Sequence, residues 1–468
     1  MRLKSIFTTS FGILLSRVTG LIRDILMTSA LGASIWSDMF LIAFKLPNLF
    51  RRIFAEGAFT QAFIPSFIAS RHKGVFATAI FLRFLLFIFS LSLIVSIFPQ
   101  PITKLLAWGF SDTMVADASV LTAINFWYLD LIFVVSFLAS LLQYKNHFAT
   151  TALSTMLLNF SMIGALLFYM KEDPQSVAYA LSFAVLLGGV LQIVAHLVSI
   201  KKFSLHKILI GGWRYKKVKN VKEEEQKFKS LFLPSMLGNS APQLASFLDT
   251  FLATFLATGS VTYLFYANRI FQLPLALIAI ATSTVLFPAV SKAIKNNNPT
   301  QAYENLSKAF WLLAFLLSLA TAGGILLAQP IVWLLFEHGN FTQAMSLQTT
   351  QVLQMYMIGL LPFGLAKLFS MYLYASHKHE KAAKIAIYGL FASSLFSLLL
   401  MNTMGVMGLA LAGSLGGWVL FILTLKEVGF EKFTHIIRSK NTLYLLVGMV
   451  PVSYIFYLLN LFLLDCIR

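Results

Sequence analysis

The charged residues that could do chemistry in this sequence lie in three otherwise apolar segments. Six of these residues are cations and three are acids, and they are accompanied by Asn48 and Asn268. Arginine holds phosphate oxygens in a two-pronged fork. The surplus of three positive charges therefore predicts a site for an anion such as a pyrophosphate. The cations are Arg17, Arg23, Lys45, Arg51, Arg52 and Arg269, and the acids are Asp24, Asp38 and Glu56.

The spacing within the second segment predicts how these side chains are arranged. Asn48, Arg52 and Glu56 recur every four residues, which places them on one stripe of a helix, with Lys45 three residues earlier. Pro47 lies inside the stripe and should kink or loosen the helix.

An alternative is that these charges only hold helices together. Arg52 would pair with Glu56, and Arg23 with Asp24 or Asp38. An ionised group near the centre of a bilayer costs about 2.5–3.5 kcal/mol on insertion scales. Such groups must therefore face one another or a wet cavity.

The elements that carry these residues belong to a membrane protein. Apolar residues make up 58% of the 468 positions and charged residues 12%, with a mean hydropathy of +0.79. Soluble domains carry about 25% charged residues. A spanning helix needs about 20 mostly apolar residues. Thirteen segments meet that requirement, approximately 5–31, 36–66, 75–98, 118–144, 149–170, 176–200, 228–257, 260–290, 306–328, 346–375, 382–400, 404–425 and 442–464.

The basic residues between these segments predict their orientation. With the N-terminus in the cytoplasm, 25 of the 36 lysines and arginines fall in cytoplasmic segments, 3 on the other side and 8 within the helices. This bias follows the positive-inside rule. It accounts for the net charge of +18 without nucleic acid, and thirteen spans place the C-terminus in the periplasm. Because Arg17 and Arg23 interrupt the first apolar run, it is predicted to be an uncleaved helix.

The chain is predicted to be an all-α, polytopic membrane protein with two similar halves. The pair Leu46-Pro47 matches Leu273-Pro274, and Ile64-Pro65 matches Phe287-Pro288. We expect an N-lobe of six helices at 1–200, a basic amphipathic linker at 201–227, a C-lobe of six helices at 228–425, and a loop with a thirteenth helix at 426–468. The linker is expected to form a short helix at the anionic leaflet, or else a disordered loop.

Residues typical of catalysis or metal binding are sparse. The single cysteine, Cys466, forms no internal disulfide, and the histidines show no metal-binding spacing. No catalytic or metal site is predicted, and the chain is expected not to be an enzyme. Asp249 and Lys367 are isolated charges that could pair, line the second lobe or, for Asp249, serve a coupling cation.

Two stretches resemble the MurJ (MviN) family of lipid II flippases. These are SRVTGLIRD at 16–24 and SDMFLIAFKLPNLFRRIFAEGAFTQAFIPSF at 37–67; the region 258–292 is also similar. The resemblance implies a transporter of the multidrug/oligosaccharidyl-lipid/polysaccharide exporter superfamily. Such a protein moves the undecaprenyl-pyrophosphate-linked peptidoglycan precursor, lipid II, across the bacterial cytoplasmic membrane by alternating access. It implies substrate-binding roles for Arg17, Arg23, Arg52 and Arg269, with Asp38 and Glu56 as acidic partners and Arg51 in the same motif; the stripe adds Asn48.

The sequence departs from the family pattern in three ways. One C-terminal helix stands where the family usually has two that hold the lipid tail. Asn268 precedes Arg269 where members often have an aspartate, and the acid of a sodium site is missing from 382–425. We expect no cofactor, and membrane potential or a coupling cation remains as the energy source. Expected partners are lipid II, membrane lipids and other cell-wall synthesis proteins. The alternatives are a related exporter of lipid-linked oligosaccharides or drugs, and a membrane-embedded enzyme acting on lipid pyrophosphates.

Overall fold

The computed structural model describes residues 3–215, 220–296 and 298–467. Within these ranges, side chains are described except at 3–10, 13, 53–56, 237–242, 245, 280–281, 284, 299, 432 and 466–467. The side chains of Glu56 and Cys466 therefore lie outside the described part. Five basic residues of the orientation argument lie outside the described ranges altogether: Arg2, Lys216, Lys217, Lys219 and Arg468.

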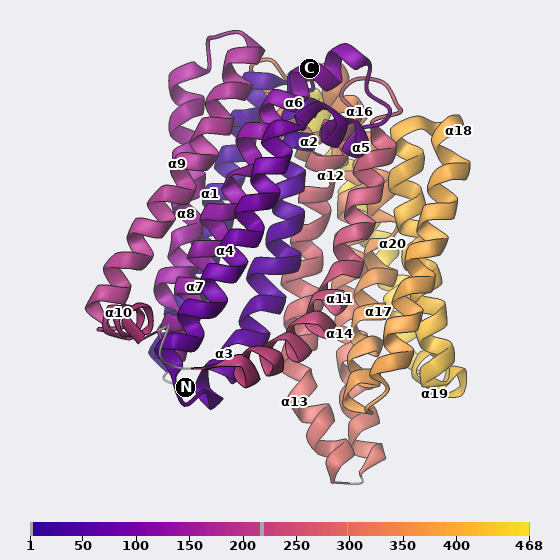
Figure 1. Cartoon of the computed structure of the whole chain (residues 1–468). Coiled ribbons are helices and arrows are strands. Elements are labelled where there is room, and N and C mark those ends of the chain that lie inside the picture. Colours follow the sequence, from indigo (N-terminus) through magenta and orange to yellow (C-terminus); the bar gives the residue numbers. More distant parts are fainter. Residues whose placement is uncertain (1–2, 216–219, 297, 468) are drawn as a thin grey trace. The chain divides into compact units, whose positions relative to one another are not determined.

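The described chain is all-helical and divides into two compact units, Met1–Phe247 and Leu248–Arg468. Figure 1 shows the long helices of the first unit running side by side. Its elements are α1 (Leu3–Leu31), α2 (Ile35–Phe50), η1 (Arg51–Ala58), α3 (Phe59–Ala69), α4 (Lys73–Ile97), α5 (Pro99–Leu106), α6 (Asp112–Phe126), α7 (Tyr128–Tyr144), α8 (Ala149–Tyr169), α9 (Pro174–Lys202), α10 (His206–Tyr215) and most of α11 (Lys222–Ala253).

The second unit is also a bundle of long helices joined by short ones. Its elements after α11 are α12 (Ser260–Pro274), η2 (Leu275–Ile280), α13 (Ala281–Lys295), α14 (Pro299–Leu326), α15 (Ala328–Phe336), α16 (Gln343–Met357), α17 (Leu360–Ala375), α18 (His379–Val428), α19 (Phe430–Ile437) and α20 (Lys440–Ile467).

The all-α membrane fold predicted from the sequence is confirmed, and each of the thirteen predicted segments coincides with a helix or a run of helices. Eight described stretches are long and apolar enough to cross a membrane, and one of them, α18, contains two predicted spans. The other four segments are α1, α2–η1–α3, α11 and α12–η2–α13. These are the more polar ones, because they carry most of the charged candidate residues.

Two predicted segments are not uniform α-helices. Residues 51–58 and 275–280 form π-helices, η1 and η2, that interrupt 36–66 and 260–290. Pro47 precedes η1 by four residues, and Pro274 directly precedes η2. Proline removes a backbone donor from the helical ladder, and π-helix, which is rare, occurs mostly as short bulges inside α-helices. Both units thus share the order α-helix, π-helix, α-helix, in agreement with the predicted repeat.

The long helix α18 is two helices that meet at Gly405. This glycine has φ 55° and ψ −134°, a left-handed φ that glycine adopts without strain. The two halves pack on each other, since the carbonyl oxygen of Gly389 lies 3.2 Å from where a Cβ of Gly416 would be. Figure 1 shows α18 folding back on itself. The break predicted between 400 and 404 therefore falls at Gly405.

The first part of α11 belongs to the first unit, although the sequence assigned 228–425 to the second lobe. Phe228 is fully buried and packs edge-on against Phe59 and Phe84, with ring centroids 5.9 and 5.6 Å apart. One turn earlier, Glu225 forms an ion pair with Arg83 of α4. These contacts attach the start of α11 to α3 and α4. The predicted division into transport lobes stays a prediction.

The basic linker contains α10, which docks on the start of α4 (Figure 1). The contact is made by two glycines. A Cβ added to Gly212 would lie 2.1 Å from the carbonyl oxygen of Gly74 and 2.4 Å from Oγ1 of Thr78. The backbones approach this closely only because both residues lack a side chain. Trp213 and Ile210 remain exposed beside this contact.

Two neighbouring glycines of α10 should respond to alanine in opposite directions. Gly212→Ala forces α10 away from Gly74, so we expect lower thermal stability and faster proteolysis between α9 and α11. Gly211→Ala meets no atom within 4 Å and should be neutral or stabilising by up to ~1 kcal/mol, because alanine favours helix. The measurement is the melting temperature of the purified protein in detergent. Equal effects of the two changes would contradict the docked position of α10.

Candidate functional site

Arg23 lies buried between α1 and α8. Its Nε and Nη2 donate to Oδ1 of Asp24 at 3.0 and 2.6 Å, and its Nη1 donates to Oδ1 of Asn159 at 3.0 Å. Arg23 is 7% exposed and Asp24 2%. If the charges only hold helices together, Arg23 is expected to pair with Asp24 or Asp38. The structure pairs it with Asp24.

Asn159 joins α8 to α1 beside this ion pair. Its Nδ2 donates to the carbonyl oxygen of Ser16 at 3.1 Å and to Oγ1 of Thr19 at 3.0 Å, while its Oδ1 accepts from Arg23. Asn159 is not among the residues predicted from the sequence. The sequence feature that could have identified it is a carboxamide within the apolar run LLNFSM, because a buried polar side chain needs a hydrogen-bond partner.

Arg17 differs from Arg23 in its surroundings, although both lie on α1. Its side chain is exposed, and among the described residues no carboxylate lies within ion-pair distance of it. An exposed guanidinium retains donors for an incoming anion. Arg17 can therefore bind a ligand without first breaking a buried ion pair.

Lys45 and Arg52 reach one face of α11. Lys45 Nζ donates to Oγ of Ser246 at 2.8 Å, and Nη1 of exposed Arg52 donates to Oε1 of Gln243 at 3.2 Å. Gln243 and Ser246, which were not predicted from the sequence, lie three residues apart, about one turn of helix. Lys45 and Arg52 therefore lie on the same side of the α2–η1 segment, as the predicted stripe requires.

The other candidates of this segment have different environments. Asn48 is half-buried and donates from Nδ2 to the carbonyl oxygen of Phe44 at 2.9 Å. Arg51 is half-buried at the first position of η1. Asp38 is 2% exposed in the first turn of α2, where the positive end of the helix dipole favours a carboxylate.

In the second unit, Arg269 is exposed on α12. Its guanidinium lies 5.1 Å from the ring centroid of Phe265, which is cation–π distance. The preceding residue, Asn268, accepts a hydrogen bond at Oδ1 from Nε2 of Gln272 one turn later. Asp249 interacts electrostatically with Tyr356, and Lys367 is exposed on α17. No ion pair joins Asp249 to Lys367 among the salt bridges of the described residues.

The chemistry available to these groups is anion binding. With Arg23 and Asp24 neutralising each other, the first-unit segments still carry four cations, Arg17, Lys45, Arg51 and Arg52, against the two acids Asp38 and Glu56. Arg17 and Arg52 are exposed, as is Arg269 in the other unit. Each exposed guanidinium offers the planar fork that fits a phosphate.

Three comparisons show which known proteins the whole chain resembles. A family model described as "Lipid II flippase MurJ" matches residues 27–465. A Helicobacter pylori protein named "Probable lipid II flippase MurJ" is 48% identical over 424 residues, which cover 88% of this chain and 92% of that protein. The solved structure "Lipid II flippase MurJ, inward closed conformation" is similar with a TM-score of 0.79 at 25% identity, covering 98% of this chain and 99% of that one.

The fold is shared more widely. An inward-facing multidrug resistance MATE family transporter of the MOP superfamily matches with a TM-score of 0.68 at 14% identity, covering 93% of this chain and 99% of that one.

Proposed function

This chain belongs to the MurJ family, and we propose that it moves lipid II from the inner to the outer leaflet of the bacterial cytoplasmic membrane. The observation that carries the proposal is the set of exposed arginines on otherwise apolar helices. Arg17, Arg52 and Arg269 are exposed although the segments around them are built for a membrane. An anionic lipid head group explains why such positions keep their charge.

In this proposal, Arg17, Arg52 and Arg269 bind the pyrophosphate of the substrate. Each guanidinium can donate two parallel hydrogen bonds to phosphate oxygens. Arg51 adds positive charge next to Arg52. The remaining proposed site residues support this binding. Asp38, Asn48 and Glu56 orient the cations or contact the sugars, and Arg23 acts through its buried partners Asp24 and Asn159.

The transport step follows from charge neutralisation. An empty site gathers like charges, which repel one another. When the pyrophosphate binds, this repulsion falls, and the helices that carry the arginines can approach. We propose that this closure on one side opens the other, so that the head group crosses while the lipid tail stays in the bilayer. The π-helices η1 and η2 are natural places for the helices to bend, because their hydrogen bonding is irregular.

The return step can use the membrane potential. The empty site is positive, and moving one elementary charge through 100 mV is worth about 2.3 kcal/mol. A negative interior would therefore draw the empty carrier back towards the cytoplasmic side. The proposal makes the chain a transporter rather than an enzyme. A surplus of positive charge also disfavours export of cationic drugs.

The proposal is tested by replacement in living cells. A strain depleted of its own lipid II flippase should recover growth and outer-leaflet lipid II when it produces this chain. The readout is lipid II accessible to a membrane-impermeant enzyme or label. Growth without recovery of accessible lipid II, or no rescue by a chain present at normal level in the membrane, would refute the proposed substrate.

The basic loops predict a specific orientation. Single cysteines placed at Lys207 in α10 and at Glu172 between α8 and α9, in a Cys466→Ser background, should react from opposite sides. An impermeant maleimide applied to intact spheroplasts should label position 172 and spare position 207 until the membrane is opened. Both positions are exposed, so access by the reagent depends on the membrane alone. Labelling of position 207 in intact spheroplasts would reverse the orientation.

A further inference from the structure

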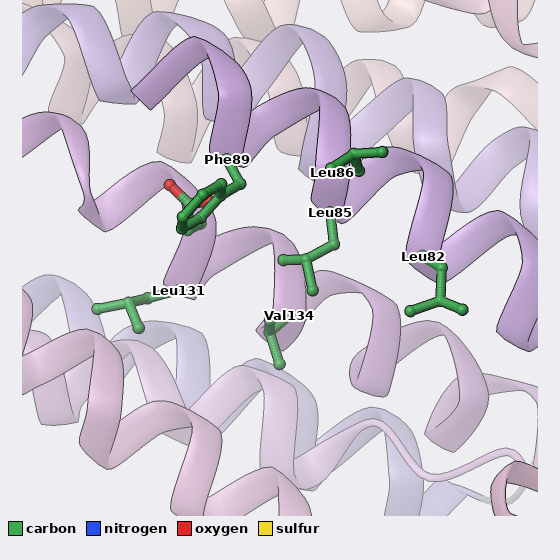
Figure 2. Close-up of a pocket in the computed structure, with 7 residues that line it drawn as sticks. Leu82, Leu85, Leu86, Phe89, Leu131 and Val134 are labelled. Atoms are coloured by element: carbon green, nitrogen blue, oxygen red, sulfur yellow. The ribbon is translucent and has the colours of Figure 1, made fainter. Parts of the chain in front are cut away.

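A second candidate site lies on elements other than those that carry the arginines. A cavity of about 490 Å³ is open along one side between α4 and α7. Figure 2 shows Leu82, Leu85, Leu86 and Phe89 along one helix, facing Leu131 and Val134 of the other. The seventh lining residue is Asp130. We call this cavity the α4–α7 groove.

Asp130 is the one polar residue of the α4–α7 groove, and half of its carboxyl group is satisfied. It is 9% exposed. Its Oδ2 accepts a hydrogen bond from Oγ of Ser92 on α4. Its Oδ1 is buried and has no hydrogen-bond partner among the described residues. A buried acceptor without a donor is unfavourable, and most buried polar atoms in natural structures have a hydrogen-bond partner. The Ser92 contact ties α4 to α7, but it leaves Oδ1 unexplained.

The position of the groove along α4 matches the position of a lipid in a bilayer. The 25 residues of α4 are about 37 Å long, slightly more than the ~30 Å hydrocarbon core. Ser92 lies five residues, about 7.5 Å, from the end at Ile97, and Leu82 lies fifteen residues, about 22 Å, from it. With α4 centred on the hydrocarbon core, Ser92 and its partner Asp130 lie just inside the hydrocarbon boundary. From there the groove descends towards the bilayer centre.

We propose that the α4–α7 groove binds the chain of a neutral membrane lipid that carries a free hydroxyl at the glycerol level. The hydroxyl donates to Oδ1 of Asp130, and the hydrocarbon lies along Leu86, Leu85 and Leu82. A chain alone would leave Oδ1 unpaired, because the hydrocarbon core holds no water. A phosphate at this level would meet a carboxyl group instead of a cation. The headgroup amine of a phospholipid lies farther out than Asp130.

The test uses two probes, an alcohol and the methyl ether in which a methyl group replaces the hydroxyl hydrogen. The purified full chain in vesicles of phosphatidylethanolamine and phosphatidylglycerol is photolabelled with a diazirine-bearing hexadecanol, or with the methyl ether of the same compound. The alcohol should label α4 and α7 peptides about fivefold more than the ether, the ratio that corresponds to ~1 kcal/mol for one hydrogen bond. Equal labelling by the two probes would overturn the proposal.

Three variants assign the preference to Asp130 and to the groove. Asp130→Leu should abolish the preference for the alcohol, whereas Asp130→Asn should keep it, since the amide retains an acceptor oxygen. Leu86→Trp should reduce labelling by both probes. Leu86 is 67% exposed, so the larger ring fills the groove without disturbing the helix packing. A preference that survives Asp130→Leu, or stronger labelling by the corresponding amine than by the alcohol, would contradict a hydroxyl site.

Discussion

Replacing Arg52 by alanine should abolish most lipid II translocation while the protein remains in the membrane at a near-normal level. Arg52 is exposed, and its contact with Oε1 of Gln243 is a hydrogen bond at the surface of the first unit. Because Arg52 itself is exposed, its removal should cost less folding stability than removal of the buried Arg23. A hydrogen bond to a charged group contributes about 1.5–3 kcal/mol, so losing one from the bound pyrophosphate lowers transport roughly 10- to 150-fold.

Replacing Arg52 by lysine separates the contribution of the positive charge from that of the planar guanidinium. Arg52→Lys keeps the positive charge but loses the fork, and should restore only part of the rate. Arg17 and Arg269 should behave as Arg52 does, and Arg71→Ala, in the exposed turn before α4, is the matched control that should have no effect. The measurement is translocation divided by membrane protein level. Full transport by a well-produced Arg52→Ala protein would end the ligand assignment.

Arg23→Ala should act through folding. Asp24 is 2% exposed, and the change removes the guanidinium with which its carboxylate forms an ion pair. Breaking a buried ion pair from one side costs about 3–5 kcal/mol, a large part of the stability of most proteins. We therefore expect a strong fall in membrane level and in melting temperature. Arg17→Ala, six residues earlier on the same helix, is the control and should leave both unchanged.

A paired change shows whether the buried charge is the cause. Arg23→Met with Asp24→Asn removes both charges and should recover much of the lost abundance, because apolar replacements of a buried pair are often neutral. Asn159→Ala should cost less than Arg23→Ala, about 1–3 kcal/mol, as the penalty for unsatisfied polar groups. A normal level of Arg23→Ala protein together with lost transport would instead make Arg23 a residue that contacts substrate.

The membrane fold could be predicted from the sequence because each spanning helix is encoded by one continuous apolar segment. Twenty apolar residues in a row must form a helix in lipid, since every backbone donor and acceptor has to be satisfied within the segment. The two π-helices were not readable. Pro47 indicated a disturbed helix, but whether the disturbance becomes a kink or a π-turn depends on packing around residues 51–58.

The candidate residues could also be predicted, because a charged residue inside an apolar segment is unusual. Their hydrogen-bond partners could not be predicted. Arg23 is bound to Asp24, its neighbour, but also to Asn159, which lies 136 positions away. Gln243 and Ser246 meet Arg52 and Lys45 only because α11 begins within the first unit. Such contacts follow from tertiary packing, which residue spacing within one helix does not reveal.

Translocation in a purified system tests most directly whether this chain moves lipid II. The chain is reconstituted in vesicles that contain fluorescent lipid II, and a membrane-impermeant reagent measures how much reaches the opposite leaflet over time. Vesicles with the wild-type chain should expose lipid II much faster than empty vesicles or vesicles with Arg52→Ala, and should leave a phospholipid with the same fluorophore in place. Rates equal to those of empty vesicles, or equal movement of the labelled phospholipid, would contradict a lipid II flippase.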